Sequence, residues 1–184
     1  YLMEDLDAVM DHVKDTDGLI IDVRNNDGGE TDNMRIITSR FIESPLEFLQ
    51  GSLKGGVPYD DPPLEPDYSK YRYTNAVVVL INGATFSMGE LFSEVMKQLP
   101  NVTLVGDTTA GGGNSGFDGI PLSKEYYLPS GKLIIVPTTS TSRYDGVPIE
   151  WNGIPPDTRI TQDDQGAQLG IDNQLEHAME LLTQ

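Results

Sequence analysis

The residues that decide the fold are 76–90, AVVVLINGATFSMGE. The first six form a continuous apolar run enriched in β-branched residues, which is typical of a buried strand. Asn82-Gly83 then predicts a tight turn, and apolar residues recur at helical spacing a few positions later. We therefore expect a strand, a turn and a helix, with Ser87 at the turn.

Ser87 admits two interpretations at that position. Residues 87–90, SMGE, have the S-x-x-E pattern of a capping box, in which the serine simply caps the helix. A serine on a strand-to-helix turn is also where acyl-transfer enzymes place a nucleophile, beside helix-terminal N–H groups. The G-x-S-x-G elbow is only half matched, because Thr85 stands in place of its first glycine. The turn alone leaves both interpretations open.

Composition limits the class of protein. The 184 residues, 38% of them hydrophobic, fit one domain with a substantial core. A net charge of −17, from 12 basic and 29 acidic residues, argues against nucleic acid or an anionic membrane as partner. The chain has no cysteine and two well-separated histidines, His12 and His177, so we expect no metal site and no cofactor.

The flanking sequence alternates between helix and strand patterns, which predicts an α/β fold with a partly parallel sheet. Expected helices lie at residues 2–13, 34–42 and 175–182, and expected strands at 19–24, 46–53 and 102–105.

Three further segments have distinct patterns of their own. Residues 124–128 and 132–138 alternate like a β-hairpin joined at Pro129-Ser130-Gly131. Residues 54–74 are polar and contain several glycines and prolines, which predicts a surface loop or a substrate-binding loop without a core element. Residues 106–116, GDTTAGGGNSG, are expected to form a mobile or backbone-exposing loop.

Four segments, in order, carry a resemblance to a known family. They are LIIDVRNNDGG at 19–29, TFSMGE at 85–90, GDTTAGG at 106–112 and GIPPD at 153–157. Together they resemble peptidase family S41, the C-terminal processing and tricorn-like proteases. The first is similar to the family's hydrophobic-D-hydrophobic-R-x-N-x-G-G segment, and the second resembles its nucleophile turn. The resemblance covers nearly the whole chain and favours Ser87 as a nucleophile.

The resemblance implies a Clp/crotonase-like α/β core with flanking helices, and a serine endopeptidase. Backbone N–H groups of Gly28 or Gly29, and of Met88, would form the oxyanion hole. Expected substrates are extended peptides, unfolded proteins or C-terminal tails. Many relatives work in the bacterial periplasm or cell envelope, which favours that location.

The source of the general base divides the family. Members with a Ser/Lys dyad carry its lysine in the glycine-rich loop. Residues 106–116, which resemble that loop, contain no lysine. The chain therefore resembles the tricorn and retinoid-binding-protein branch, where a histidine is the base and a glutamate supports it. Glu150, just before residues 153–157, resembles that glutamate; the alternative is a solvated loop carboxylate.

The general base itself is expected to be missing from these residues. His12 and His177 both fall beside the apolar stripe of helix-like segments, as exposed helical histidines do, and neither matches the family's histidine. We expect residues 1–184 to be a single S41 core domain, a fragment of a longer chain whose upstream part supplies the base and a PDZ domain.

Two alternatives come from other functional classes. One is a non-catalytic S41-like module that binds peptides or apolar small molecules, as retinoid-binding relatives do. The other is a crotonase-type acyl-CoA enzyme, because that fold also presents paired backbone N–H groups to a thioester. The acidic composition, without a basic cluster for nucleotide phosphates, disfavours the second.

Overall fold

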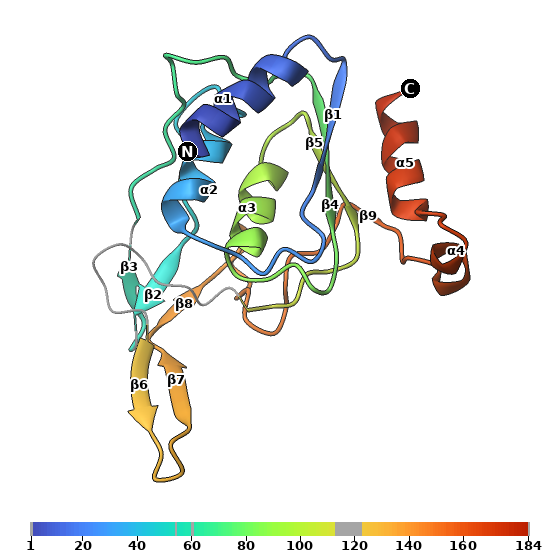
Figure 1. Ribbon diagram of the computed structural model, residues 1–184. Helices are drawn as coiled ribbons and strands as arrows, with labels where there is room; N and C mark the ends of the chain where they lie inside the picture. The colour runs from blue at the N-terminus through green and yellow to red at the C-terminus, as the bar shows by residue number, and fades with distance from the viewer. Residues whose placement is uncertain (1, 54, 60, 113–122, 184) are drawn as a thin grey trace.

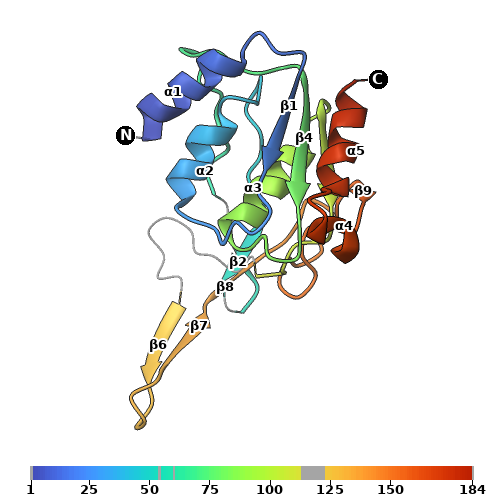
Figure 2. The same ribbon diagram turned by 45° about the vertical axis from the view of Figure 1, so that its right-hand side comes forward.

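The computed structural model describes residues 2–53, 55–59, 61–112 and 123–183. A four-stranded parallel sheet, ordered β1-β4-β5-β9, forms its centre, with helices on both faces (Figure 1, Figure 2). The elements in chain order are α1 (Leu2–Val13), β1 (Gly18–Asp22), α2 (Thr31–Thr38), β2 (Gly51–Leu53), β3 (Val57–Tyr59), β4 (Ala76–Ile81), α3 (Met88–Lys97), β5 (Val102–Gly106), β6 (Ser123–Tyr127), β7 (Leu133–Pro137), β8 (Thr139–Thr141), β9 (Thr158–Arg159), α4 (Asp164–Gln168) and α5 (Asn173–Leu182).

β4 confirms the prediction made from its apolar run. It lies between β1 and β5, and its last five residues are buried. Val77, Val79 and Ile81 pack into the larger core, which also holds Met10 of α1, Met34 of α2 and Leu91 of α3. Val78 and Leu80 face the smaller core, which contains Ala178 of α5. A parallel strand covered by helices on both faces has no solvent-facing side, which explains the unbroken apolar run.

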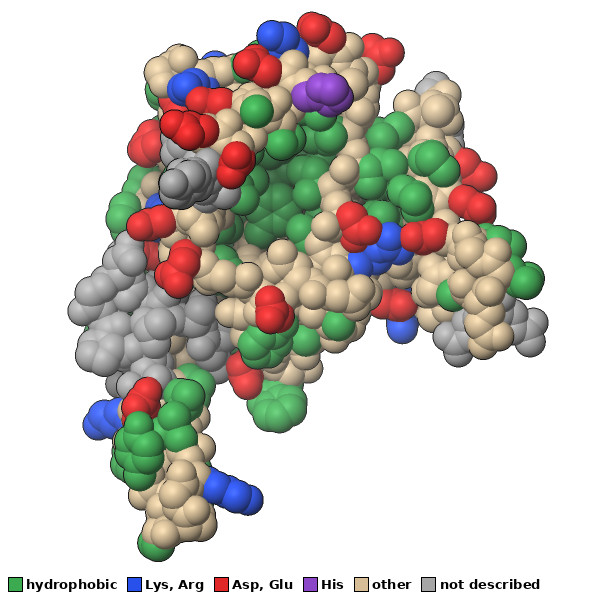
Figure 3. Space-filling model, viewed as in Figure 1, with side chains coloured by type: hydrophobic (Ala, Val, Ile, Leu, Met, Phe, Trp, Pro, Cys, Tyr) green, Lys and Arg blue, Asp and Glu red, His purple; other side chains and the backbone are tan. Residues whose placement is uncertain are grey.

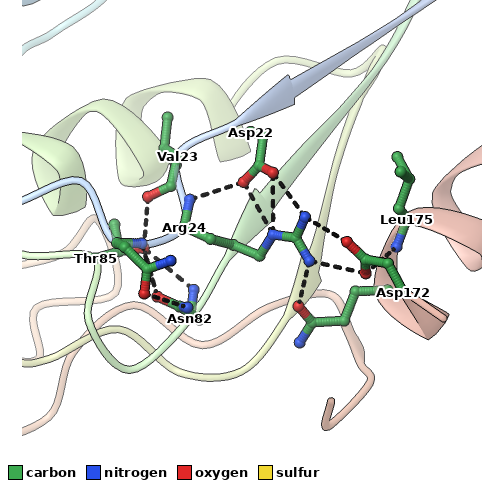
Figure 4. Close-up of polar contacts among 9 residues, drawn as sticks. Asp22, Val23, Arg24, Asn82, Thr85, Asp172 and Leu175 are labelled. Carbon is green, nitrogen blue, oxygen red and sulfur yellow. Dashed lines mark hydrogen bonds and ion pairs between the residues drawn. The ribbon is translucent and has the colours of Figure 1, made fainter. Parts of the chain in front are cut away.

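An ion-pair network attaches α5 to the end of β1 (Figure 4). The Arg24 guanidinium donates to the carboxylates of Asp22 and Asp172, with an Nη2–Oδ2 distance of 2.7 Å to each. Its Nη1 also donates to the side-chain oxygen of Gln174 at 3.1 Å. Asp172 is the N-cap of α5 and accepts the N–H of Leu175. One arginine thus connects residues that are 148 positions apart in the chain.

Several element boundaries differ from the sequence-based prediction. α2 ends at Thr38, and residues 39–41 continue as turns in which Arg40 and Phe41 donate to carbonyls three residues back. The predicted strand at 46–53 is reduced to β2, which joins β3 and β8 in a three-stranded antiparallel sheet. The short helix α4 lacks an apolar repeat and was not predicted. Local pattern therefore identified the long elements better than their ends.

The prediction that residues 54–74 contain no core element is wrong. Leu64 and Tyr73 are almost completely buried in the larger core. Leu64 forms a backbone bridge with Leu46, and the Tyr73 ring lies 6.4 Å from that of Phe41. The Tyr73 hydroxyl donates to the carbonyl of Thr16 at 3.1 Å. Leu64 and Tyr73 lie among prolines and polar residues, and they are buried by residues far away in the sequence. Their burial therefore produces no periodic apolar pattern in residues 54–74.

The predicted hairpin is confirmed, and it projects from the body of the molecule (Figure 1, Figure 2). β6 and β7 form a separate two-stranded sheet. Both strands expose large apolar side chains, among them Tyr127 and Ile135. Within the described ranges, each helix is too short or too polar to span a lipid bilayer.

The network around Arg24 predicts a pH-dependent attachment of α5. The Arg24 hydrogen bond holds the pKa of Asp172 below its ordinary value of 3.8. A lowered folded-state pKa means that the carboxylate stabilises the fold fully above that ordinary value, and less as the pH falls through the folded-state value. We expect Asp172→Asn, which keeps a capping side chain, to lower the free energy of unfolding by about 1 kcal/mol at pH 7, because the pair is partly screened by solvent.

Urea unfolding of both proteins between pH 7 and pH 3 would measure this effect. The difference between wild type and Asp172→Asn should shrink as the pH falls below 4. Asp11→Asn is the control, since the exposed Asp11–Lys14 pair is expected to contribute little at any pH. A difference for Asp172→Asn that stays constant down to pH 3 would contradict the assignment.

Candidate active site

Two turns meet at the carboxyl ends of β1 and β4. The Thr85 hydroxyl donates to the carbonyl of Val23 at 2.9 Å, and the backbone N–H of Asn25 donates to the side chain of Asn82 at 3.1 Å (Figure 4). The backbone N–H of Phe86 donates to the carbonyl of Asn26 at 2.9 Å. These bonds hold the segment before Gly28-Gly29 against the segment before Ser87, so two of the four family segments are in direct contact.

Ser87 lies at the N-cap of α3 in a strained conformation. Its φ of 52° and ψ of −122° lie in a region that non-glycine residues rarely occupy. The capping box predicted for this turn is present, because the Glu90 carboxylate accepts the Ser87 N–H at 3.1 Å. Cap and nucleophile are compatible, since the positive end of a helix dipole supports an anion that develops beside it. The backbone thus resembles the strained elbow of serine hydrolases.

Gly28 packs against Ser87 so closely that no side chain fits there. A Cβ on Gly28 would lie 2.8 Å from the Ser87 Cβ, 3.1 Å from its Oγ and 3.0 Å from the Met88 nitrogen. The Gly28 N–H already donates to the side chain of Asn26 at 2.9 Å. By contrast, the hydrogen bonds of the described residues give the N–H groups of Gly29 and Met88 no acceptor. Within the described part of the chain, the free donors are therefore the N–H groups of Gly29, which follows Gly28, and of Met88, which follows Ser87.

The buried carboxylate of Glu90 joins the Ser87 turn to the glycine-rich loop. Besides Ser87, it accepts the Thr109 hydroxyl at 2.5 Å and the N–H groups of Gly111 and Gly112 at 2.7 and 2.8 Å. Glu90 is completely buried, so these four donors replace its water shell. In the sequence, the S-x-x-E pattern marks Glu90 only as part of a helix cap, because its partners Thr109, Gly111 and Gly112 lie about twenty residues away.

The remaining two family segments are held together through Thr109. Its hydroxyl oxygen accepts the N–H of Ile154 at 2.7 Å, and its own N–H donates to the Ile154 carbonyl at 3.2 Å. Gly153 adopts a φ of 66°, where a Cβ would lie 2.4 Å from the Thr109 carbonyl oxygen. The Asp157 side chain accepts the N–H of Leu104 at 2.8 Å. All four segments therefore belong to one connected assembly around Ser87.

Glu150 lies on the segment that packs against the glycine-rich loop. Its neighbour Trp151 donates its N–H to the carbonyl of Gly111 at 2.9 Å and has a φ of 65°. Glu150 itself is half-buried. Among the described residues, no hydrogen bond or ion pair involves its carboxylate, and none joins it to Ser87. The structure thus brings Glu150 close to the loop that Glu90 anchors, and its carboxylate has no partner within the described ranges.

Neither histidine contacts Ser87. His12 is exposed on α1, and His177 lies on α5, which covers the opposite face of the sheet from α3 (Figure 2). The His177 Nδ1 is 3.6 Å from the Glu180 carboxylate. In the part of the chain described, no imidazole or amine hydrogen-bonds the Ser87 hydroxyl. Residues 113–116 of the expected loop lie outside the described residues.

The assembly of these four segments agrees with a match to a known family. The sequence profile of peptidase family S41 matches residues 2–160. The chain belongs to peptidase family S41. Its parallel sheet, flanking helices and strained serine turn are the Clp/crotonase-like α/β fold of the S41 proteases, as expected from the sequence.

Individual S41 relatives agree with this assignment. The chain is 27% identical over 146 residues to the carboxy-terminal processing protease CtpA of Bacillus subtilis, covering 79% of this chain and 29% of that protein. A candidate peptidase of Parabacteroides merdae has a solved structure that is 30% identical, with a TM-score of 0.83 over 97% of this chain and 56% of that one. The tricorn protease is 22% identical and matches 90% of this chain and 15% of its own, with a TM-score of 0.60. The chain thus spans less than two thirds of the length of each of these three proteins.

Because four donors surround the Glu90 carboxylate, we expect removal of its charge to lower the stability of the fold strongly. In Glu90→Gln an amide nitrogen replaces one oxygen and faces N–H groups that then lack an acceptor. We expect the free energy of unfolding to fall by about 2–4 kcal/mol, measured by urea unfolding at pH 7.

Glu94, one turn further along α3, provides the matched control. It is also buried, burial raises its pKa, and its carboxylate accepts the Tyr144 N–H at 3.0 Å, a bond that a glutamine oxygen can keep. Glu94→Gln should therefore cost less than about 1 kcal/mol. Equal effects of the two substitutions would show that Glu90 does not hold the loop.

Proposed function

We propose that this chain is the catalytic core of an S41 serine endopeptidase with Ser87 as its nucleophile. The Ser87 hydroxyl attacks the scissile carbonyl, and the N–H groups of Gly29 and Met88 stabilise the resulting oxyanion. A preorganised donor of this kind contributes roughly 3–4 kcal/mol to transition-state stabilisation. The oxyanion then collapses, the C–N bond breaks, and the amine leaves with the proton that the general base took from Ser87. Water hydrolyses the acyl-enzyme, which releases the acid and restores the Ser87 hydroxyl.

One observation carries this proposal: a strained serine begins a helix and packs against Gly28, and the residues that follow each of them, Met88 and Gly29, have N–H groups without an acceptor among the described residues. A serine that served only as a cap would not need a φ of 52°, because N-cap residues ordinarily adopt extended backbone angles. Strain of this kind costs about 1–3 kcal/mol and persists where surrounding contacts impose it. Here the Glu90 carboxylate and the tight contact with Gly28 impose it.

The same proposal assigns the general base to a part of the parent protein outside residues 1–184. A serine hydroxyl needs a neutral imidazole or amine within hydrogen-bond reach, and His12 and His177 lie elsewhere. Glu150 supports that base, in keeping with its place beside the glycine-rich loop and with the tricorn-like branch. An oxyanion hole and a nucleophile without a general base give only residual peptidase activity. We therefore expect residues 1–184 alone to be nearly inactive.

The proposed substrates are peptide bonds in unfolded proteins or C-terminal tails. This choice follows from membership of the S41 family and from similarity to a carboxy-terminal processing protease. The proposal also includes a longer parent chain in which residues 1–184 are the core domain and a PDZ domain precedes it.

A second candidate function is a non-catalytic module that binds peptides or apolar small molecules. It is favoured by the absence of a base beside Ser87 in the described residues and by an apolar cavity of about 210 Å³ next to the serine turn. Binding of such ligands by the full-length parent, together with no hydrolysis of unfolded casein, would favour this function over proteolysis.

Labelling of Ser87 tests the first proposal directly. We expect a fluorophosphonate probe to label Ser87 in the folded parent protein, and Ser87→Ala to abolish labelling, as read by peptide mapping with mass spectrometry. Ser93→Ala is the matched control on the same helix, since the Ser93 hydroxyl only donates to the Gly89 carbonyl within α3. A folded parent protein in which Ser87 stays unlabelled would refute a nucleophilic role.

Glu150 gives a separate test of the supporting role. In the parent protein, Glu150→Gln should lower kcat by at least about tenfold, because a misoriented base transfers the proton poorly. The free energy of unfolding should stay within about 0.5 kcal/mol, since the described residues give this carboxylate no partner. Glu176→Gln on the exposed side of α5 is the control and should alter neither quantity. An unchanged kcat for Glu150→Gln would show that Glu150 is a solvated loop carboxylate without a catalytic role.

A further inference from the structure

An apolar cavity opens beside the Ser87 turn, between β1, α2 and α3. Its volume is about 210 Å³. Figure 3 shows a hollow floored by hydrophobic side chains on this face of the molecule, below α1. The cavity walls are formed by the apolar side chains of Ile21, Val23, Met34, Ile37, Met88 and Phe92. The polar side chains at this cavity are Asn26, Glu30 and Asn33.

One wall of this cavity is the candidate oxyanion hole itself. Gly28, Gly29, Met88 and Gly89 line the cavity, and the N–H groups of Gly29 and Met88 have no acceptor in the described ranges. A carbonyl oxygen bound by these two groups places its carbon beside Ser87. The side chain on the acyl side starts from a Cα bonded directly to that carbon, whereas the side chain on the leaving-group side starts from a Cα two bonds from it, beyond the amide nitrogen. The acyl-side residue is therefore the one within immediate reach of the cavity.

We propose that this cavity binds the side chain of the substrate residue that carries the scissile carbonyl, and that it selects a large apolar side chain such as Phe, Leu or Met. This assignment rests on the proposed function of Ser87 as a nucleophile. It adds a substrate preference that depends on Met34 and Ile37 of α2 and on Phe92 of α3.

Size and charge both favour a large apolar side chain. An apolar protein cavity of about 150 Å³ is known to hold benzene, so 210 Å³ accommodates a phenyl ring or a leucine side chain. A glycine or alanine would leave most of the apolar wall in contact with water and forgo the gain from burying it. Glu30 is the one ionisable residue of this lining and is exposed, so an acidic side chain would lose hydration without finding a cation.

The cavity can be tested on this chain without any catalysis. The six methionines can be labelled at their methyl carbons and observed by NMR in the presence of benzene. We expect the signals of Met34 and Met88, which line the cavity, to shift on titration. Those of Met10, Met96 and Met179 lie outside the lining and serve as internal controls. Signals of Met34 and Met88 that do not move up to saturation with benzene would overturn the proposal.

The substrate preference is tested on the parent protein with peptidyl diphenyl phosphonates that differ only in their last side chain. These probes carry no leaving-group peptide: the serine oxygen forms a bond to phosphorus and phenol leaves. We expect the Phe and Leu probes to react with Ser87 at least about tenfold faster than the Gly and Glu probes. Equal rates would overturn the assignment of the cavity while leaving Ser87 as a nucleophile.

Neighbouring isoleucines of α2 supply matched variants. Ile37→Trp fills the cavity and should abolish both the benzene shifts and the preference for Phe over Gly. Ile36→Trp, at a half-buried position outside the lining, should keep both. If Ile37→Trp does not fold, Ile37→Ala is used instead, and the enlarged cavity should extend the preference to Trp.

The outcomes separate this inference from the proposed function. Reaction of Ser87 with all phosphonates but without side-chain preference contradicts the cavity assignment alone. Failure of every phosphonate to react, with benzene bound beside Met34 and Met88, contradicts the peptidase and favours the ligand-binding alternative.

Discussion

The candidate site depends on one buried carboxylate. The two oxygens of Glu90 accept hydrogen bonds from Ser87, Thr109, Gly111 and Gly112. A carboxylate removed from water costs several kcal/mol unless such donors replace its hydration, so the two segments that supply them are held close to it. The left-handed conformation of Ser87 persists because its own N–H is one of these donors. The Glu90 carboxylate therefore holds the start of α3, the serine turn and the glycine-rich loop together as one structural unit.

The sheet determines where this unit can form. β1 and β4 are parallel neighbours, so their carboxyl ends lie at the same edge, and both functional turns leave the sheet there. Ligands of parallel α/β sheets bind at that edge, outside the ends of the strands. The opposite face is covered by α5, which Arg24 ties to the same end of β1. The charge network and the site thus share one edge of the sheet without sharing residues.

Local sequence patterns predicted a large part of the fold and some of the site. The strand-turn-helix around Ser87 and the hairpin each follow from residues adjacent in the chain. The burial of Leu64 and Tyr73, the early end of α2 and the partners of Glu90 did not, because each depends on residues far away in sequence. For Glu90, the pair Gly111-Gly112 was a usable signal, since exposed N–H groups in a glycine-rich loop need an anion or carboxylate to accept them.

The sequence by itself determined the class of the chain: an acidic, cysteine-free α/β domain whose four ordered segments belong to an S41 peptidase. Tertiary structure decided which backbone groups are available at the site. Gly28 and Gly29 look equivalent in the sequence, yet the Asn26 side chain accepts the N–H of Gly28, whereas the N–H of Gly29 has no acceptor among the residues that the structure describes. The apolar cavity is likewise formed by three separate elements. Hydrogen-bond partners and cavities are properties of spatial neighbours, which periodicity along one chain segment does not specify.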